Sequence, residues 1–475
     1  MHNPRRIYLL DPQQLPPETI AVAFAKTSRS PEAFDSIAAE LSDEKSAQFH
    51  EKWVVGYGHA SVAEHAVLHI AVENISRLAV ECLESNRLAS YTEKSTRYQQ
   101  WDNNSYHTPA ELHDHALLPV YNQTINTLFS AYAQFLPELE DLAKAKYPKN
   151  EKETENAWKQ RIRTKYIDVA RFVLPAASLA NVGMTINARA LEHALQKMFA
   201  HPLQEVRQMG NEIRAIAQAE VPTLVKYITP GDHLQTAARV FQNVPIHAAI
   251  DKPAEDCSLV RWEENGEERV LAAALYRYQH ISYAQALAAI QAMNLEQKVA
   301  LIKAILDLPE KYDIPIRELE HTNVTFDILL DQGAYFELKR HRMMTQSAQE
   351  LSTAWGYALP AWIVEAGLAE QYHQAMQQVI NAYPMIEKEL PGIGSYIIPN
   401  AFNRRVLLTL NMRSMLHLIK LRCAENAHFS IRRITGKMLQ QLTSVYPSFA
   451  QYFQCYAGQS WQTLESETFE STQCY

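Results

Sequence analysis

An internal repeat constrains the fold of this 475-residue chain more than any other feature of its sequence. Apolar residues recur three or four positions apart over 203–219 and again over 427–445, which predicts two amphipathic helices, each followed by a proline. Arg207 in the first helix and Arg432 in the second lie 225 residues apart, and the two prolines have the same separation. A period this long indicates two domains rather than a solenoid.

Further landmarks repeat in the same order. Residues 187–189 (Asn-Ala-Arg) match residues 411–413 (Asn-Met-Arg) at an offset of 224, and the Glu-His pairs at 64–65 and 320–321 match at an offset of 256. Alternating apolar and polar residues after each histidine predict a strand, and a helix is expected after each strand. The expected elements are strands at 67–72 and 323–330 and helices at 76–88 and 332–344.

These offsets define two tandem copies, residues 1–235 and residues 236–475. The offset falls from 256 to 225 along the chain, so the first copy holds about 31 additional residues, most simply in the charged stretch 143–160. Glycine is scarce, 13 residues in all, which disfavours an all-β architecture rich in glycine turns. We therefore predict a helix-rich α+β fold in which the two copies pack as a pseudo-dimer.

Composition excludes several classes of protein. The net charge of −8 argues against a nucleic-acid partner. No apolar run approaches the length of a membrane span, and the N-terminus lacks the pattern of a secretory signal. Five scattered cysteines without a C-x-x-C pair disfavour a disulfide framework and predict a cytoplasmic location. His65 and His69 lie four residues apart, but no third ligand is evident, and we expect no metal site.

Two segments contain the residues that are most suggestive of chemistry. Residues 90–98 place several hydroxyls, Glu93 and Arg97 in a short polar loop that can bind phosphate, although a solvated turn with a helix cap has the same composition. Residues 339–342 (Lys-Arg-His-Arg) crowd cations at the end of a predicted helix. An anion would relieve their repulsion, whereas hydrated cations at a helix C-terminus would need none.

Together with the repeat, these segments resemble the flavin-dependent thymidylate synthase (ThyX) family. The family motif is R-H-R, seven residues, and then Ser-x-Arg-Tyr. The second copy has R-H-R at 340–342, and the first copy has Ser-Thr-Arg-Tyr at 95–98. Each copy has lost the other half of the motif, because residues 85–87 read Ser-Asn-Arg, and Glu350 and Ser352 replace the serine and the arginine.

The resemblance implies a composite active site. In this family the R-H-R arginines and a later arginine come from one subunit, and the Ser-x-Arg loop comes from a neighbouring subunit. The two copies would therefore form one well-equipped site and one degenerate site. Counting ten residues back from Arg432 reaches Arg422, whereas counting ten back from Arg207 reaches Lys197. Lysine does not replace arginine at a bidentate site.

The resemblance also implies the reaction and its residues. FAD would be the cofactor, with NADPH and methylenetetrahydrofolate as co-substrates, for the reductive methylation of dUMP to dTMP. Arg340 and Arg422 would be catalytic, with Arg422 stabilising negative charge on the ring carbonyl. The substrate-binding residues would be Ser95, Thr96, Arg97, Glu337, Arg340 and Arg422. The cofactor-binding residues would be His65, Thr92, Glu93, His321, His341, Arg342 and Asn411.

One departure keeps other functions open. Three residues before R-H-R the family commonly has Gln, and this chain has Glu337. A carboxylate can accept a hydrogen bond from an exocyclic amine, which uracil lacks. A flavoenzyme that modifies another pyrimidine nucleotide and a non-catalytic paralogue that binds flavin or nucleotide are therefore the alternatives. The resemblance implies an assembly of four copies, as in a homotetramer of single-copy chains. Two chains of this protein contain four copies, so we expect a homodimer.

Overall fold

The protein forms two compact units, which we call unit 1 and unit 2. Unit 1 contains residues 1–95, 105–116 and 177–248, and unit 2 contains residues 96–104, 117–176 and 249–475. The structure, a computed structural model, describes residues 5–28, 30–56, 60–97, 99–226, 228–229, 231–246, 255–307, 313–453, 455 and 459–475. The expected boundary between residues 235 and 236 lies inside helix α9 (Asp232–Gln242) and stays a prediction about the sequence copies.

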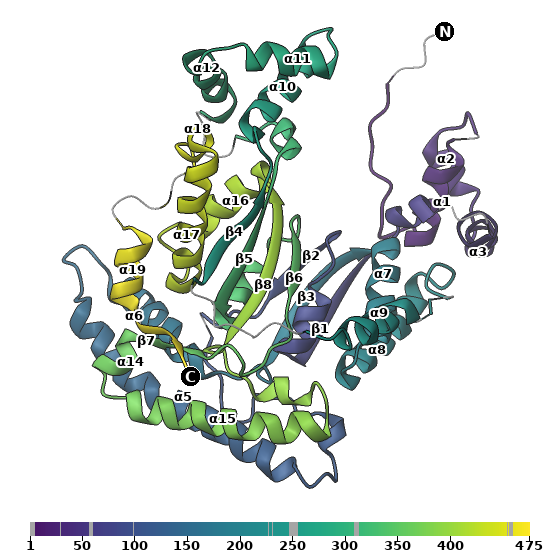
Figure 1. The fold of residues 1–475 in the computed structure, drawn as a ribbon. Coiled ribbons are helices and arrows are strands. Elements are labelled where there is room, and N and C mark those ends of the chain that lie inside the picture. Colours follow the sequence, from purple (N-terminus) through teal and green to yellow (C-terminus); the bar gives the residue numbers. More distant parts are fainter. Residues whose placement is uncertain are drawn as a thin grey trace. The chain divides into compact units, whose positions relative to one another are not determined.

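Unit 1 is a three-stranded antiparallel sheet with helices around it (Figure 1). The strand order is β1-β3-β2, with β1 at Val67–Ser76, β2 at Ala89–Glu93 and β3 at Leu179–Asn187. The helices before the sheet are α1 (Pro17–Lys26), α2 (Phe34–Ala39), α3 (Asp43–Phe49), η1 (His50–Gly56) and η2 (Ala60–His65). The later helices, besides α9, are α4 (Arg77–Leu83), η3 (Ala110–Leu112), α7 (Ala188–Phe199) and α8 (Gln204–Glu220).

Unit 2 repeats this sheet and adds an edge strand, in the order β4-β5-β8-β6. Its strands are β4 (Cys257–Trp262), β5 (Asn323–Asp331), β6 (Thr345–Ala348) and β8 (Asn403–Asn411), and a separate ribbon joins β7 (Tyr357–Pro360) to β9 (Phe469–Cys474). The helices that pack on the sheet's core are α13 (Gln332–Leu338), α16 (Met412–Arg422) and α17 (Phe429–Val445).

The remaining helices of unit 2 lie at its two ends. α5 (Leu118–Lys146), from the first half of the sequence, runs beside α15 (Ala369–Glu389), and Gln378 donates a hydrogen bond to Thr124 (Figure 1). Around them lie α6 (Glu155–Ala170), η4 (Arg171–Val173), α14 (Ala361–Glu365), η6 (Ile393–Ile397) and α19 (Trp461–Thr468). At the other end are α10 (Gly266–Tyr278), α11 (Tyr283–Gln291), α12 (Leu295–Leu306), η5 (Arg317–His321) and α18 (Pro447–Ala450), where the Phe449 amide donates to Glu267 of α10.

The repeat predicted from the sequence extends to strand register and helix capping. Ser90 of β2 pairs with Thr185 of β3, and Thr345 of β6 pairs with Thr409 of β8. An asparagine side chain caps both following helices: Asn187 accepts from the Ala190 amide, and Asn411 accepts from the Ser414 amide. The helix-rich α+β fold with two copies of one motif is thus confirmed.

Helix register corrects one sequence match. The buried positions of α7 are 188, 191, 194, 195 and 198, and those of α16 are 412, 415, 418 and 419. These sets superpose at an offset of 224, which places Met198 opposite Arg422. Counting back from Arg207 gave Lys197 instead, because the connection from α7 to α8 differs in length from that between α16 and α17. Either residue leaves the first copy without this arginine.

Two helices and one loop were predicted to extend further than they do. The helices expected over 76–88 and 332–344 end at Leu83 and Leu338, so the R-H-R residues lie in the turn after α13. The polar loop expected over 90–98 is partly a strand, because residues 89–93 pair with β3. The additional residues of the first copy are accounted for in large part by α6 and by the greater length of α5.

The structure bears on the predictions about disulfides and about membrane spans. A disulfide joins Cys423 to Cys455, so the cysteines form at least one cross-link although they form no framework. Among the described residues, no helix is both long enough and apolar enough to span a membrane.

Candidate functional site

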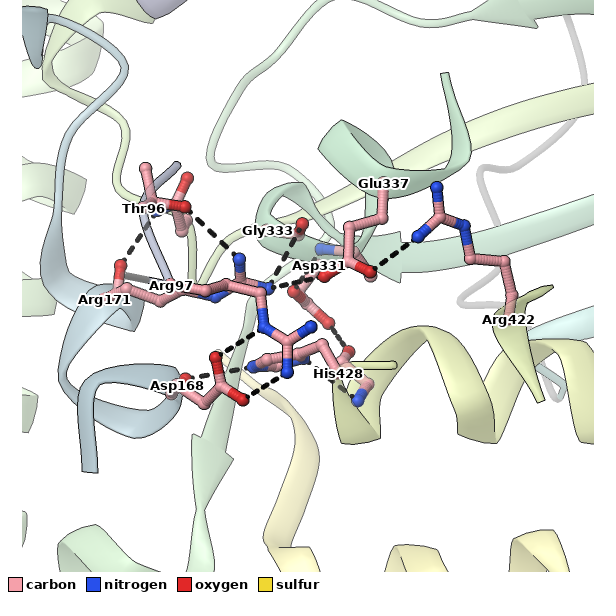
Figure 2. A network of polar contacts seen from close by, with 12 residues as sticks. Thr96, Arg97, Asp168, Arg171, Asp331, Gly333, Glu337, Arg422 and His428 are labelled. Atoms are coloured by element: carbon pink, nitrogen blue, oxygen red, sulfur yellow. Dashed lines mark hydrogen bonds and ion pairs between the residues drawn. The ribbon is translucent and has the colours of Figure 1, made fainter. Parts of the chain in front are cut away.

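The candidate site lies within unit 2 and joins side chains from both halves of the sequence (Figure 2). Arg97 lies in a turn that follows β2 in the sequence. Its guanidinium donates to both carboxylate oxygens of Asp168, Nε to Oδ1 at 2.8 Å and Nη2 to Oδ2 at 2.7 Å. The third nitrogen, Nη1, donates to the carbonyl of Asn426 at 2.9 Å. α6 thus fixes the orientation of Arg97 from the first half, and the loop before α17 fixes it from the second half.

His428 links the same two segments, α6 and the start of α17. It is fully buried, and its Nδ1 accepts from the Ser430 amide at 3.2 Å, so Nε2 is the protonated nitrogen and donates to the Asp168 carbonyl at 3.0 Å. Burial, followed by the charges of Arg171 and Arg97, holds the pKa of His428 well below its usual value. The histidine is therefore a neutral structural link between α6 and α17.

Glu337 connects two further arginines. Arg171 of η4 is buried, and its Nη2 lies 3.4 Å from Glu337 Oε1, while its Nη1 donates to Thr96 Oγ1 at 3.3 Å. Arg422, the last residue of α16, donates from Nη1 to Glu337 Oε2 at 3.1 Å. Figure 2 shows the carboxylate of Glu337 between the two guanidiniums. Glu337, in the last turn of α13, is therefore the one carboxylate in the network of Figure 2 that contacts both arginines.

His341, the histidine of R-H-R, is an acceptor in this arrangement. Arg422 Nε donates to His341 Nε2 at 2.9 Å, so that ring nitrogen has no proton. Burial, the Arg422 charge and the neighbouring His417 lower the pKa of His341 to about 3. At neutral pH the ring is uncharged, and any proton it offers to a ligand comes from Nδ1.

Arginines are crowded in this cluster. Arg97 pairs with Asp168, Glu337 lies between Arg171 and Arg422, and the buried Asp331 lies near Arg171. Burial lowers the pKa of Arg422 most, and the charges of Arg340 and Arg97 lower it further, against an opposing effect of Glu337. Those two cations are therefore near enough to Arg422 to repel it. An anionic ligand would relieve this repulsion.

Four of the predicted site residues belong to unit 1. Ser95 immediately precedes Thr96 in the sequence, and Thr92 lies exposed in β2. Glu93 forms a buried ion pair with Arg77, which gives it a structural role within unit 1. His65 ends η2 and lines a cavity of about 630 Å³ together with Phe24, Trp53 and other residues of the N-terminal helices.

The remaining predicted residues lie in unit 2. Asn411 caps α16 through its side-chain oxygen, which is a structural use of that atom. His321 is exposed at the end of η5, in the position that His65 occupies in unit 1. Arg340 is exposed, whereas Arg342 is partly buried; both follow α13. The second histidine of the pair considered for a metal, His69, contacts Thr185 Oγ1 at 2.9 Å, and among the described residues no cluster of three metal ligands occurs.

The sequence reasoning missed Arg171 and Asp168. At the offset of 224 that relates β3 to β8, Arg171 corresponds to Ser395, so it is one more arginine kept in a single copy. That comparison would have revealed it. Asp168 lies in α6, which has no counterpart in the second copy, so the repeat gave no signal for it.

Comparisons with known proteins identify the family. The model of the family "Thymidylate synthase complementing protein" matches residues 9–223 and again residues 258–448. The chain belongs to this family, and the resemblance read from its sequence is confirmed. The flavin-dependent thymidylate synthase of Clostridium tetani is 30% identical over 45% of this chain and 83% of its own length.

Relatives of similar length share both halves. A UPF0159 protein of Chlamydia muridarum is 28% identical over 87% of this chain and 82% of its own, and one of Thermoplasma acidophilum is 26% identical over 86% and 89%. Among solved structures, the UMP/dUMP methylase PolB of Streptomyces cacaoi matches 42% of this chain and 93% of its own at 14% identity. Its TM-score is 0.33, which supports no argument about this chain.

Proposed function

We propose that this protein is an enzyme of the flavin-dependent thymidylate synthase type, and that it binds a pyrimidine deoxynucleotide, most simply dUMP, at the cluster in unit 2. The single observation behind this proposal is that Arg97 and Arg171 from the first half meet Glu337 and Arg422 from the second half. A relative with 30% identity is named as a flavin-dependent thymidylate synthase.

The residues suit a nucleotide monophosphate. Guanidiniums bind phosphate through paired, charge-assisted hydrogen bonds. Arg97 and the Ser95–Thr96 segment would hold the phosphate, and Arg171 is a further donor beside Thr96. Arg422 would stabilise the negative charge that develops on the pyrimidine carbonyl, and Arg340 would contact the same substrate. In this proposal Asp168 and His428 position Arg97 and contact no substrate.

The donor set also fits FAD. The cation of Arg342 suits a pyrophosphate, and the Nδ1–H of neutral His341 suits a carbonyl or phosphate oxygen. His65, His321, Thr92, Glu93 and Asn411 remain in the proposed cofactor-binding set. When bound, reduced FAD supplies hydride, and the protein supplies binding, orientation and charge. NADPH as reductant, methylenetetrahydrofolate as carbon donor, a cytoplasmic location and a homodimer complete the proposal.

Glu337 favours a second candidate, a cytosine nucleotide. Both of its oxygens already face guanidiniums, and each retains a lone pair that can accept from an exocyclic amine. The glutamine common in the family can also accept such a bond, but it cannot neutralise the two arginines. A parallel titration with dCMP separates the candidates.

Visible spectroscopy of the purified protein tests the proposal. We expect FAD to be retained or taken up and its absorption bands to shift when dUMP is added. A shift with dCMP but not with dUMP would transfer the proposal to the cytosine nucleotide. Protein that takes up no flavin would contradict the proposed function and leave a nucleotide-binding role to be tested by calorimetry.

A further inference from the structure

A disulfide bond lies one residue beyond the end of the helix that presents Arg422. α16 ends at Arg422, and the next residue, Cys423, is bonded to Cys455, 32 residues further along the chain. The Cys423 amide donates to the Ile419 carbonyl at 2.9 Å and so belongs to the last turn of the helix. The bond therefore attaches the C-terminus of α16 to the segment between α18 and α19.

The bond is accessible from a cavity. A space of about 270 Å³ is lined by both cysteines together with Arg432, Gln459 and Trp461. Cys423 is buried, with 3% of its surface exposed, whereas Cys455 is partly exposed. A thiolate that enters this cavity would therefore reach the sulfur of Cys455 first, and Cys423 would be the leaving group.

The surroundings also suit the reduced form. The Cys423 sulfur lies 3.4 Å from Thr435 Oγ1, and that hydroxyl donates its own proton to the Ile431 carbonyl at 2.9 Å. Thr435 Oγ1 is therefore an acceptor for the S–H of a reduced Cys423. Because neither state leaves this buried sulfur without a suitable neighbour, the site can exist in both states.

We propose that Cys423 and Cys455 form a reversible thiol–disulfide site that takes a dithiol as reductant, and that its state sets how firmly Arg422 is held against Glu337 and His341. One thiolate of the reductant attacks the Cys455 sulfur, and the Cys423 sulfur departs and takes a proton. The second thiol of the reductant then closes its own disulfide and releases Cys455 as a thiol. Two electrons and two protons pass to the protein.

The coupling to Arg422 follows from covalent geometry. In the oxidised form the residue after Arg422 is fixed at two points, by the helix and by the cross-link. In the reduced form the covalent link is gone, and only the helix, its packing and the weak contact with Thr435 hold the residue, while the ends of helices fray. The guanidinium contacts at 2.9 and 3.1 Å depend on the position of that last turn. The expected effect on nucleotide binding rests on the proposed function, whereas the redox site and its effect on α16 do not.

Differential alkylation tests the redox site. The full-length protein is equilibrated with ratios of reduced to oxidised dithiothreitol, alkylated and mapped by mass spectrometry. We expect Cys423 and Cys455 to become reactive together as the ratio rises and to be protected together when it falls. Thiols that remain alkylatable under fully oxidising conditions would overturn the site.

Hydrogen exchange tests the coupling without any nucleotide. Deuterium uptake by peptides that cover the end of α16 should rise on reduction and in Cys455→Ser, and it should be unchanged in Cys474→Ser, which removes a cysteine outside the pair. Binding of dUMP, measured well below the melting temperature, should weaken on the order of tenfold in the same two cases, because small displacements of a positioning group cost up to about a hundredfold.

Equal uptake and equal dUMP affinity in the oxidised and reduced forms would overturn the coupling. A loss of melting temperature alone, with uptake and affinity unchanged, would show a purely structural cross-link. If neither form binds dUMP, the proposed function fails, and the exchange data still decide the coupling.

Discussion

In both units a hydrogen bond between a serine and a carboxylate joins the sheet to the long helix, but the two residues have exchanged positions. In unit 1 the amide and hydroxyl of Ser76 donate to the carboxylate of Glu205, at 2.7 and 2.6 Å. In unit 2 the equivalent positions hold Asp331 and Ser430, and the serine hydroxyl donates to the aspartate. The hydroxyl and the carboxylate have changed places, but the bond between the sheet and the long helix remains. Packing in both copies has therefore been maintained by compensation.

The positions around R-H-R show no such compensation. In unit 1 Lys197 Nζ contacts Ser85 Oγ at 2.8 Å, near Cys82, and Met198 occupies the place of the late arginine. The equivalents of Cys82 and Ser85 in unit 2 are Glu337 and Arg340. Burial lowers the pKa of Lys197, and the cluster has no guanidinium from α7. The arginines at the first R-H-R position and at the end of α16 are present in one copy, whereas Arg87 and Arg342 stand at the third position in both, and the fold is present twice.

The largest expected effect is on dUMP binding, and it distinguishes the R-H-R position of unit 2 from the same position of unit 1. Arg340→Ala should weaken dUMP binding by about a hundredfold, equivalent to about 3 kcal/mol, because a charge-assisted contact to an anionic nucleotide is lost. The matched control is Ser85→Ala, at the same position of the other copy, which should leave binding unchanged. Isothermal titration calorimetry measures both. Equal losses in the two variants would mean that the first copy also contributes its R-H-R position to binding.

A second comparison concerns the position three residues before R-H-R. Glu337→Gln removes the charge between two largely buried arginines and should lower the free energy of unfolding by about 3 kcal/mol. Cys82→Ser, the matched change in unit 1, should cost less than about 1 kcal/mol. Urea unfolding gives both values, and dUMP should restore more stability to Glu337→Gln than to the wild type. A Glu337→Gln protein as stable as the wild type would contradict the bridging role.

Acid should destabilise both units through one partly buried histidine in each. The pKa of His341 is about 3 and that of His201, in unit 1, is about 4, and burial is the main cause of each. Unfolded histidines take up protons near pH 6.5, so the unfolded state binds more protons as the pH falls below that value, and stability declines. Each histidine accounts for about 2 kcal/mol between pH 6.5 and 5.

Urea unfolding at pH 7 and pH 5 tests this origin of the pH dependence. His341→Gln and His201→Gln should each flatten the dependence by a similar amount. A dependence as steep as that of the wild type in either variant would assign the acid sensitivity to other groups.

The smallest effect distinguishes a cap from a ligand. Asn187→Ala and Asn411→Ala each remove a helix cap and should each cost about 1 kcal/mol. If Asn411 also binds FAD, only Asn411→Ala will weaken flavin binding, which fluorescence quenching of FAD measures. Equal flavin affinity in both variants would restrict Asn411 to its structural role.

Much of the fold could be predicted because the repeat is expressed in periodic apolar positions. The helices that begin at Gln204 and Phe429, and the strands that begin at Val67 and Asn323, follow directly from those positions. The ends of α4 and α13 were less predictable. At the end of α4, Ser85 Oγ donates to the Cys82 carbonyl at 2.7 Å and Asn86 Nδ2 to the Leu83 carbonyl at 3.0 Å, and the pattern of apolar residues does not report such local bonds.

The site was predictable only where a motif marks it. Arg97, Arg340 and Arg422 stand at motif positions, whereas Arg171 stands in an apolar segment and Asp168 in a helix unique to the first copy. The carboxylate partners of these arginines depend on which helices meet in space. Sequence periodicity does not report which helices meet. The pairing of Asp168 with Arg97 and the position of Glu337 between Arg171 and Arg422 were therefore seen only in the structure.

Binding stoichiometry tests the central claim most directly, namely that the two halves build one equipped site between them. Calorimetric titration of the FAD-loaded protein with dUMP should give one site per chain, and Arg97→Ala and Arg422→Ala, one from each half, should each abolish it. Two sites per chain, or one site that survives either substitution, would contradict the account.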